Sequence, residues 1–158
     1  MALRDLSLPT TQITVSGGSF AVRGLSFADI TQIAQDHGAE AAMVFGEVTG
    51  QYESGTLSQD GLRGLISRTA PRFVDLTAAV ISLAADDYSP EAIAMAKRLP
   101  VPAQVEAVEA IFLHTFTSES EVKKFAERII RMMSGVSSTL RQVQLPVSGD
   151  GSGASEGK

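Results

Sequence analysis

Residues 13–30, ITVSGGSFAVRGLSFADI, decide the fold of this chain, because they join a short strand pair to a capped helix. Ile13–Val15 and Ser19–Arg23 are strand-like, and within the second segment Phe20 alternates with smaller or polar neighbours. The Ser16–Gly18 segment lies between them, and glycines at such a place are typical of a hairpin turn. We therefore expect an antiparallel β-hairpin.

The first helix should follow directly after Gly24, which ends the second strand. Ser26 is placed to cap this helix, and Asp29 three residues later lies near the positive end of its dipole, in a variant of the capping box. The helix should run from about 27 to 37, with Gly38 as its stop.

Glycine, proline and capping signals divide the rest of the body into further helices. Gly46 and Gly50 are interpreted as helix-ending or loop glycines, so the second helix should stop near Thr49. Pro100 and Pro102 should force an extended connection before the next helix. The segments expected to be helical after the first are about 39–49, 58–70, 72–85, 90–99, 103–116 and 119–134.

The segment from about 72 to 85 has apolar side chains on nearly all its faces, which is the pattern of a helix buried all round. We expect it to form the centre of the core. Towards the C-terminus, Ser118 should cap the last long helix, with Glu121 completing a second capping box.

Two apolar stripes are candidate protein-binding faces. One lies on the expected 103–116 helix and is marked by Val105, Val108 and Phe112. The other lies on the expected 119–134 helix and is marked by residues at helical spacing, Val122, Phe125, Ile129 and Met133. Packing on the protein's own core is the competing interpretation for both stripes.

Composition excludes several function classes. The chain has no cysteine, so disulfides and thiolate metal sites are excluded. Its net charge of −5 argues against nucleic-acid binding, which draws on clustered Lys and Arg. No stretch approaches the roughly 20 apolar residues that cross a bilayer. We expect neither a nucleic-acid nor a membrane partner.

Few residues suggest catalysis. His37 fits a capping role at the end of the first helix, and His114 fits either half-buried core or surface; neither has a partner at metal-ligand spacing. Asp86 and Asp87 are adjacent in a turn, where side chains usually point apart. The Ser16–Ser19 segment lacks the lysine of a phosphate-binding loop. We therefore expect no enzyme, no metal and no cofactor.

The predicted fold is mainly α: a single domain of about six helices with a short N-terminal β-hairpin and a disordered C-terminal tail. Its expected parts are a flexible N-terminus over 1–11, the hairpin and helical domain over 12–143, and a flexible Gly/Ser-rich tail over 144–158.

Residues 14–25, TVSGGSFAVRGL, resemble the start of the tail assembly chaperones of long-tailed bacteriophages, also called pre-tape-measure proteins. Several of these open with a V-x-GG-S-F-x-V-R-G-L strand pair before their helices. The resemblance implies a self-associating chaperone in the host cytoplasm. It would bind the tape measure protein, keep it soluble, help to recruit tail-tube subunits, and be absent from the mature virion.

The end of the chain carries a further implication of that resemblance. In the family a fraction of ribosomes shift frame near the end of the gene, which adds a second domain. Gly157 and Lys158 would mark the frameshift position, because a slippery heptamer of the G-GGA-AAG type is read as Gly-Lys. A chance dipeptide is the competing interpretation.

Other function classes stay open at this point. The leading alternative is a structural or adaptor subunit of the virion, such as a tail or head-completion protein, which would use the hairpin for β-augmentation between copies. A small regulator of a bacterial host ranks third, and an enzyme ranks fourth.

Overall fold

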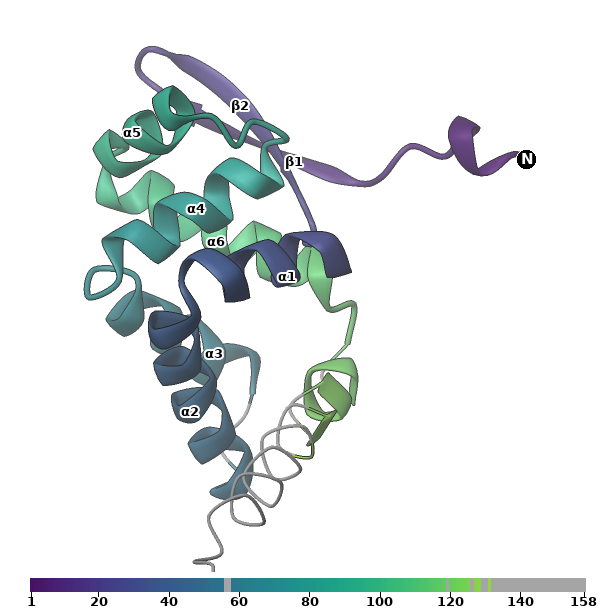
Figure 1. Cartoon of the computed structure of the whole chain (residues 1–158), viewed down its shortest axis with the longest axis vertical. Coiled ribbons are helices and arrows are strands. Elements are labelled where there is room, and N and C mark those ends of the chain that lie inside the picture. Colours follow the sequence, from purple (N-terminus) through teal and green to yellow (C-terminus); the bar gives the residue numbers. More distant parts are fainter. Residues whose placement is uncertain (56–57, 119, 126, 129–130, 132–158) are drawn as a thin grey trace, which may run out of the picture.

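The computed structural model describes residues 1–55, 58–118, 120–125, 127–128 and 131, without the side chains of Thr49, Tyr52, Gln59 and Leu62. A 3₁₀ turn (Leu3–Asp5) is followed by a hairpin of β1 (Thr10–Val15) and β2 (Gly18–Arg23) and then by helices (Figure 1). The helices are α1 (Phe27–Asp36), α2 (Gly38–Glu53), α3 (Gln59–Thr69), α4 (Val74–Ala84), α5 (Pro90–Arg98) and α6 (Val101–Thr115). Residues 120–125 are also helical.

The predicted mainly α fold with an N-terminal hairpin is confirmed. The expected tail over 144–158 lies outside the described residues, as do most of the residues expected to end the last helix.

The hairpin forms because one of its faces is apolar and its turn contains glycine. Its register pairs Ile13 with Phe20 and Val15 with Gly18, so Ser16 and Gly17 make the turn. Gly18 has φ 147°, a backbone conformation that side-chain-bearing residues rarely adopt, which explains glycine there. Ile13 and Val22 are fully buried, because the apolar face of the hairpin packs on α6.

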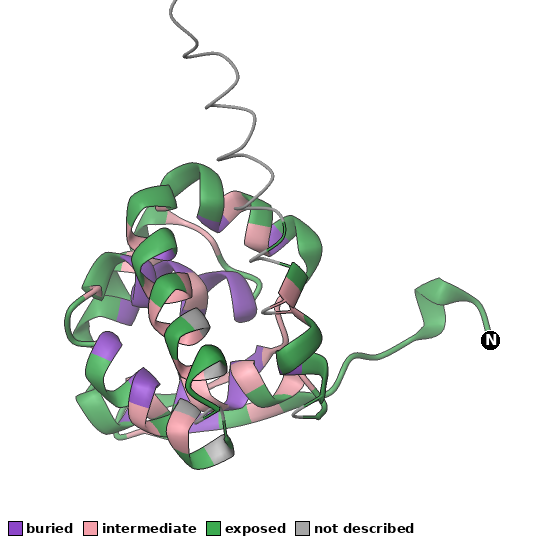
Figure 2. Cartoon of the chain, turned by 90° about the horizontal axis from the view of Figure 1, so that it is seen from below, coloured by how far each residue is buried: buried purple, intermediate pink, exposed green. Residues whose placement is uncertain are grey.

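Helix α4 is the centre of the core, as its all-round apolar pattern predicts. Eight of its eleven residues are buried, and it contacts α1, α5, α6 and β2. Figure 1 shows α4 between the hairpin with α5 on one side and α2 with α3 on the other. In Figure 2 the buried residues gather in this interior, whereas the segment before β1 is exposed along its whole length.

Of the two capping boxes predicted at helix starts, the structure forms one completely. The Ser26 hydroxyl accepts a hydrogen bond from the Asp29 N–H, and the Asp29 carboxylate accepts one from the Ser26 N–H, so the predicted capping box is confirmed. The second predicted capping box is only half formed. The Ser118 hydroxyl accepts from the Glu121 N–H, but the Glu121 carboxylate accepts from the N–H and hydroxyl of Thr117.

Two predicted helix boundaries are wrong. Helix α2 continues through Gly46 and Gly50 to Glu53, because its apolar residues pack against the core and outweigh the weak helix propensity of glycine. Helix α6 begins at Val101, so Pro102 lies in its first turn. Proline is tolerated there because the first N–H groups of a helix have no partner within the helix.

The junction between β2 and α1 is held by a largely buried ion pair between Arg23 and Asp29. Arg23 contacts Asp29 at 2.7 Å and Asp86 at 2.7 Å, and it also donates to the carbonyl of Leu83. Hydrogen bonds to the two aspartates raise the pKa of Arg23. Burial alone would raise the pKa of Asp29, but hydrogen bonds from Arg23 and Ser26 lower the pKa by more than burial raises it, so it lies below its usual value.

The same junction brings two backbones into close contact. A Cβ atom at Gly24 would lie 2.6 Å from the carbonyl oxygen of His114, at the end of α6. Nearby, the Leu25 N–H donates to the Thr115 hydroxyl at 2.9 Å, and Thr11 hydrogen-bonds His114 Nε2 at 2.8 Å. The hairpin is therefore fixed against the C-terminal end of α6.

Candidate apolar binding site

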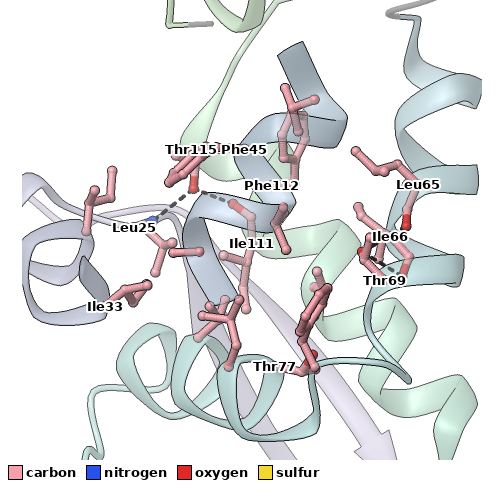
Figure 3. Close-up of a pocket in the computed structure, with 18 of the residues that line it drawn as sticks. Leu25, Ile33, Phe45, Leu65, Ile66, Thr69, Thr77, Ile111, Phe112 and Thr115 are labelled. Carbon is pink, nitrogen blue, oxygen red and sulfur yellow. Dashed lines mark hydrogen bonds between the residues drawn. The ribbon is translucent and has the colours of Figure 1, made fainter. Parts of the chain in front are cut away.

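An apolar pocket with a volume of about 240 Å³ lies between α1, α2, α3, α4, α6 and the segment at 122–125 (Figure 3). Its walls come from two clusters of buried side chains, one around Leu65, Ile66 and Val122 and the other around Ile33 and Leu76. An apolar cavity of about 150 Å³ already admits a benzene ring. This pocket is therefore large enough for apolar side chains of a partner.

Four phenylalanines line one side of the pocket and contact one another in a row. The ring centroids of Phe112 and Phe116 are 4.8 Å apart, those of Phe116 and Phe125 are 5.1 Å apart, and those of Phe125 and Phe45 are 6.0 Å apart. These rings come from α2, α6 and the segment after α6, and all four are half-buried. Large, partly exposed aromatic rings are typical of surfaces that bind other proteins.

The polar groups in the lining already have partners. The Thr115 hydroxyl donates to the Ile111 carbonyl at 2.6 Å, the Thr69 hydroxyl donates to the Leu65 carbonyl at 2.8 Å, and the Thr77 hydroxyl donates to the Ala70 carbonyl at 3.1 Å. Figure 3 shows these threonines among the apolar side chains. The pocket therefore suits an apolar partner better than a polar ligand.

Ion pairs join the helices next to the pocket. Glu47 on α2 contacts Arg72 at 3.0 Å, and the Arg72 guanidinium lies 5.4 Å from the ring centroid of the lining residue Phe73. On the other side, Arg63 of α3 pairs with Glu109 of α6. These pairs are partly exposed, so each contributes little to stability, but they place charged groups beside the apolar lining.

The structure brings four of the predicted binding residues together. Val108 and Phe112 from the first stripe and Val122 and Phe125 from the second all line the pocket. Val105 is half-buried on α6 and does not line it. Ile129 and Met133, and the predicted frameshift position at Gly157 and Lys158, lie outside the described residues.

Sequence reasoning missed the contribution of α2. Ala41, Val44, Phe45 and Val48 all line the pocket and follow the i, i+3, i+4, i+7 spacing of one helix face. That signal was present in the sequence. It is partly hidden because Gly46 lies within it.

Three of the residues considered for catalysis have structural partners. Asp86 pairs with Arg23, His114 bonds Thr11, and His37 ends α1 with its Nδ1 4.0 Å from Glu40. Within the described part of the chain, no group of three or more His, Cys, Asp or Glu residues could hold a metal ion. Over the same part, no helix is both long and apolar enough to span a membrane.

Comparison with protein families decides the class of this chain. A family model described as pre-tape measure protein matches residues 1–145. The chain belongs to the pre-tape measure protein family. The match includes the hairpin, all of α1 to α6 and every described residue that lines the pocket. The comparisons found no significant match among curated proteins or among solved structures.

Membership confirms the resemblance carried by residues 14–25 and makes this a phage tail-related protein. The name of the family connects its members with the tape measure protein. This family is not a known family of enzymes.

Proposed function

We propose that this protein is a non-enzymatic tail assembly chaperone that binds the tape measure protein in the host cytoplasm and keeps it soluble. In this proposal several copies associate along the client and help to recruit tail-tube subunits. They are absent from the mature virion. Family membership supports the connection with the tape measure, and the pocket supplies a physical basis for binding.

The observation that carries the proposal is the convergence of two separate apolar stripes on one pocket. Val108 and Phe112 belong to α6, whereas Val122 and Phe125 follow it in the chain. If the side chains of the two stripes packed completely against the other described residues of the core, no empty volume would lie between them. Instead they line a partly open pocket of about 240 Å³.

A chaperone for a long, apolar-striped helical client needs such a preformed surface. An amphipathic helix binds by laying its apolar face into a groove, with anchors at i, i+3, i+4 and i+7. Covering those anchors removes the exposed apolar surface through which the client would aggregate. The ion pairs beside the pocket can meet the polar edges of such a helix.

Co-expression with the tape measure protein tests this function. We expect the tape measure protein to become soluble and to co-purify with this chain, and we expect this chain to be missing from finished particles. If the client's solubility does not change, the proposal fails. If this chain is found in mature virions, the structural or adaptor alternative takes its place.

The proposed frameshift at Gly157 and Lys158 is tested separately, with the nucleotide sequence. The proposal requires a slippery heptamer at these codons and an overlapping second reading frame. A longer product should then be detected by mass spectrometry in infected cells. Codons that cannot slip would remove this part of the proposal without affecting the chaperone role.

A further inference from the structure

The segment before β1 is an arm that leaves the body of the protein with its apolar side chains exposed. We define the arm as residues 1–9. Its four large apolar residues have exposed fractions of 103% for Met1, 86% for Leu3, 54% for Leu6 and 58% for Leu8. Figure 1 and Figure 2, which differ by a quarter turn, both show the arm projecting away from the helices.

Local structure directs the arm outward. Its base is fixed, because Thr10 pairs with Arg23 and Thr11 bonds His114. Pro9 restricts its own backbone and disfavours the helical conformation for Leu8, so the chain continues in an extended form ahead of β1. In the structure the arm thus extends from its base beside the end of α6 and projects away from the helices.

Within the part of the chain that the structure describes, the molecule therefore presents two apolar features, a partly open pocket and an exposed arm, that suit each other. The pocket has an apolar lining whose threonine hydroxyls are already bonded, and the arm offers leucines on a narrow segment. The arm's two charged side chains, Arg4 and Asp5, are opposite in sign and 3.9 Å apart, so they give it no net side-chain charge to oppose docking.

We infer that the arm of one copy docks into the apolar pocket of a second copy, with Leu3, its most exposed leucine, as the main anchor. The inference deepens the proposed function and relies on it for the role of the pocket. The neighbour's arm fills the pocket while the tape measure protein is absent, and the client replaces it. Because arm and pocket are different patches, one contact leaves a free arm and a free pocket for further copies.

Disulfide crosslinking tests the contact without competing thiols, because the chain has no cysteine of its own. A Leu6→Cys chain is mixed with a Val48→Cys chain, in which the cysteine lies in the pocket wall. A Leu6→Cys chain mixed with a Met95→Cys chain is the matched control, since Met95 is exposed on α5 away from the pocket lining. We expect a covalent dimer in the first mixture and little in the second.

Replacing the anchor Leu3 by Ser within the Leu6→Cys chain should weaken crosslinking about tenfold, the factor expected when one leucine is no longer buried. Equal crosslinking with Val48→Cys and Met95→Cys would overturn the inference. So would a Leu6→Cys/Val48→Cys chain that closes its disulfide within one molecule at high dilution, because the arm would then fill its own pocket.

These measurements use the chain alone, so they are independent of the client test. If the copies crosslink and the tape measure protein stays insoluble, the arm contact holds and the chaperone proposal fails. If the client becomes soluble and no arm-to-pocket crosslink forms, the chaperone proposal holds and the arm contact fails.

Discussion

Two sides of this protein are built from different residues. The hairpin side is the buried cluster around Ile13 and Val22, and the pocket side is the lining of the apolar pocket. Around the hairpin the buried side chains are mostly small, including Ala84, Ala96, Ala103 and Ala107, and helices and strands approach closely. Around the pocket the lining combines phenylalanines with isoleucine, leucine, valine, alanine and threonine side chains, and the described residues leave a volume of about 240 Å³ between them. Small residues allow dense packing, whereas the larger side chains of the pocket lining leave space between them. We assign stability to the first side and, as part of the proposed function, binding to the second.

The largest effect should come from Gly24→Ala, which adds a Cβ atom at the close backbone contact between Gly24 and His114 on the hairpin side. The new Cβ would lie 2.6 Å from the His114 carbonyl oxygen, and backbone atoms cannot move aside cheaply. We expect a loss of about 3 kcal/mol in the free energy of unfolding, measured by urea denaturation.

The control for this variant is Gly46→Ala on α2, where a new Cβ meets nothing within 4 Å. This change should stabilise the protein by up to about 1 kcal/mol, because alanine favours helix more than glycine does. Similar losses in both variants would show that the hairpin side is no more tightly packed than the pocket side.

Arg23→Met should give the next largest effect, because it leaves the buried Asp29 carboxylate without its cation. We expect a loss of about 2 kcal/mol, below the usual range for a fully buried pair, because Ser26 still donates to Asp29. The double variant Arg23→Met/Asp29→Asn should recover part of this loss in the same denaturation assay. Wild-type stability in Arg23→Met would mean that the ion pair does not hold the hairpin.

The same substitution placed on both sides compares their packing directly. Ala107→Leu puts a larger side chain into a fully buried position under the hairpin and should destabilise the protein by about 1.5 kcal/mol. Ala41→Leu extends a side chain into the pocket and should be neutral or stabilising by less than about 1 kcal/mol. Thermal unfolding of both variants checks the difference, and the opposite order would contradict the distinction between the two sides.

The smallest effect concerns pH. The folded-state pKa of Asp29 is lower than its unfolded value of about 3.9. Its contribution to stability is therefore complete well above that value and is lost as the pH falls through the folded pKa. The stability advantage of wild type over Asp29→Asn should be constant from about pH 7 to 5 and shrink below about pH 4. Parallel stability curves down to pH 2 would contradict this.

Local signals in the sequence predicted the parts of the fold that depend on neighbouring residues. Ser26 and Asp29 are three residues apart, and their reciprocal hydrogen bonds form as expected. The start of α5 near residue 90 was also expected, and in the structure Ser89 caps this helix with Pro90 at its first position. The all-round apolar pattern of α4 identified the core helix.

Features that depend on distant residues could not be predicted in the same way. Arg23 and Asp86 are far apart in the chain, and no local pattern indicates that they pair. The continuation of α2 through Gly46 depends on packing against α1 and α3. The apolar stripes were visible, but their convergence on one pocket required the arrangement of five helices and the segment after them.

The most direct test of the central claim is the solubility of the tape measure protein when it is co-expressed with Ala41→Leu, with Gly46→Ala and with wild type. The claim is that the pocket binds the client. Ala41→Leu should fold normally, by circular dichroism and thermal unfolding, yet leave the client insoluble, whereas Gly46→Ala should match wild type. Full solubility of the client with Ala41→Leu would contradict the claim and place the client elsewhere on the protein.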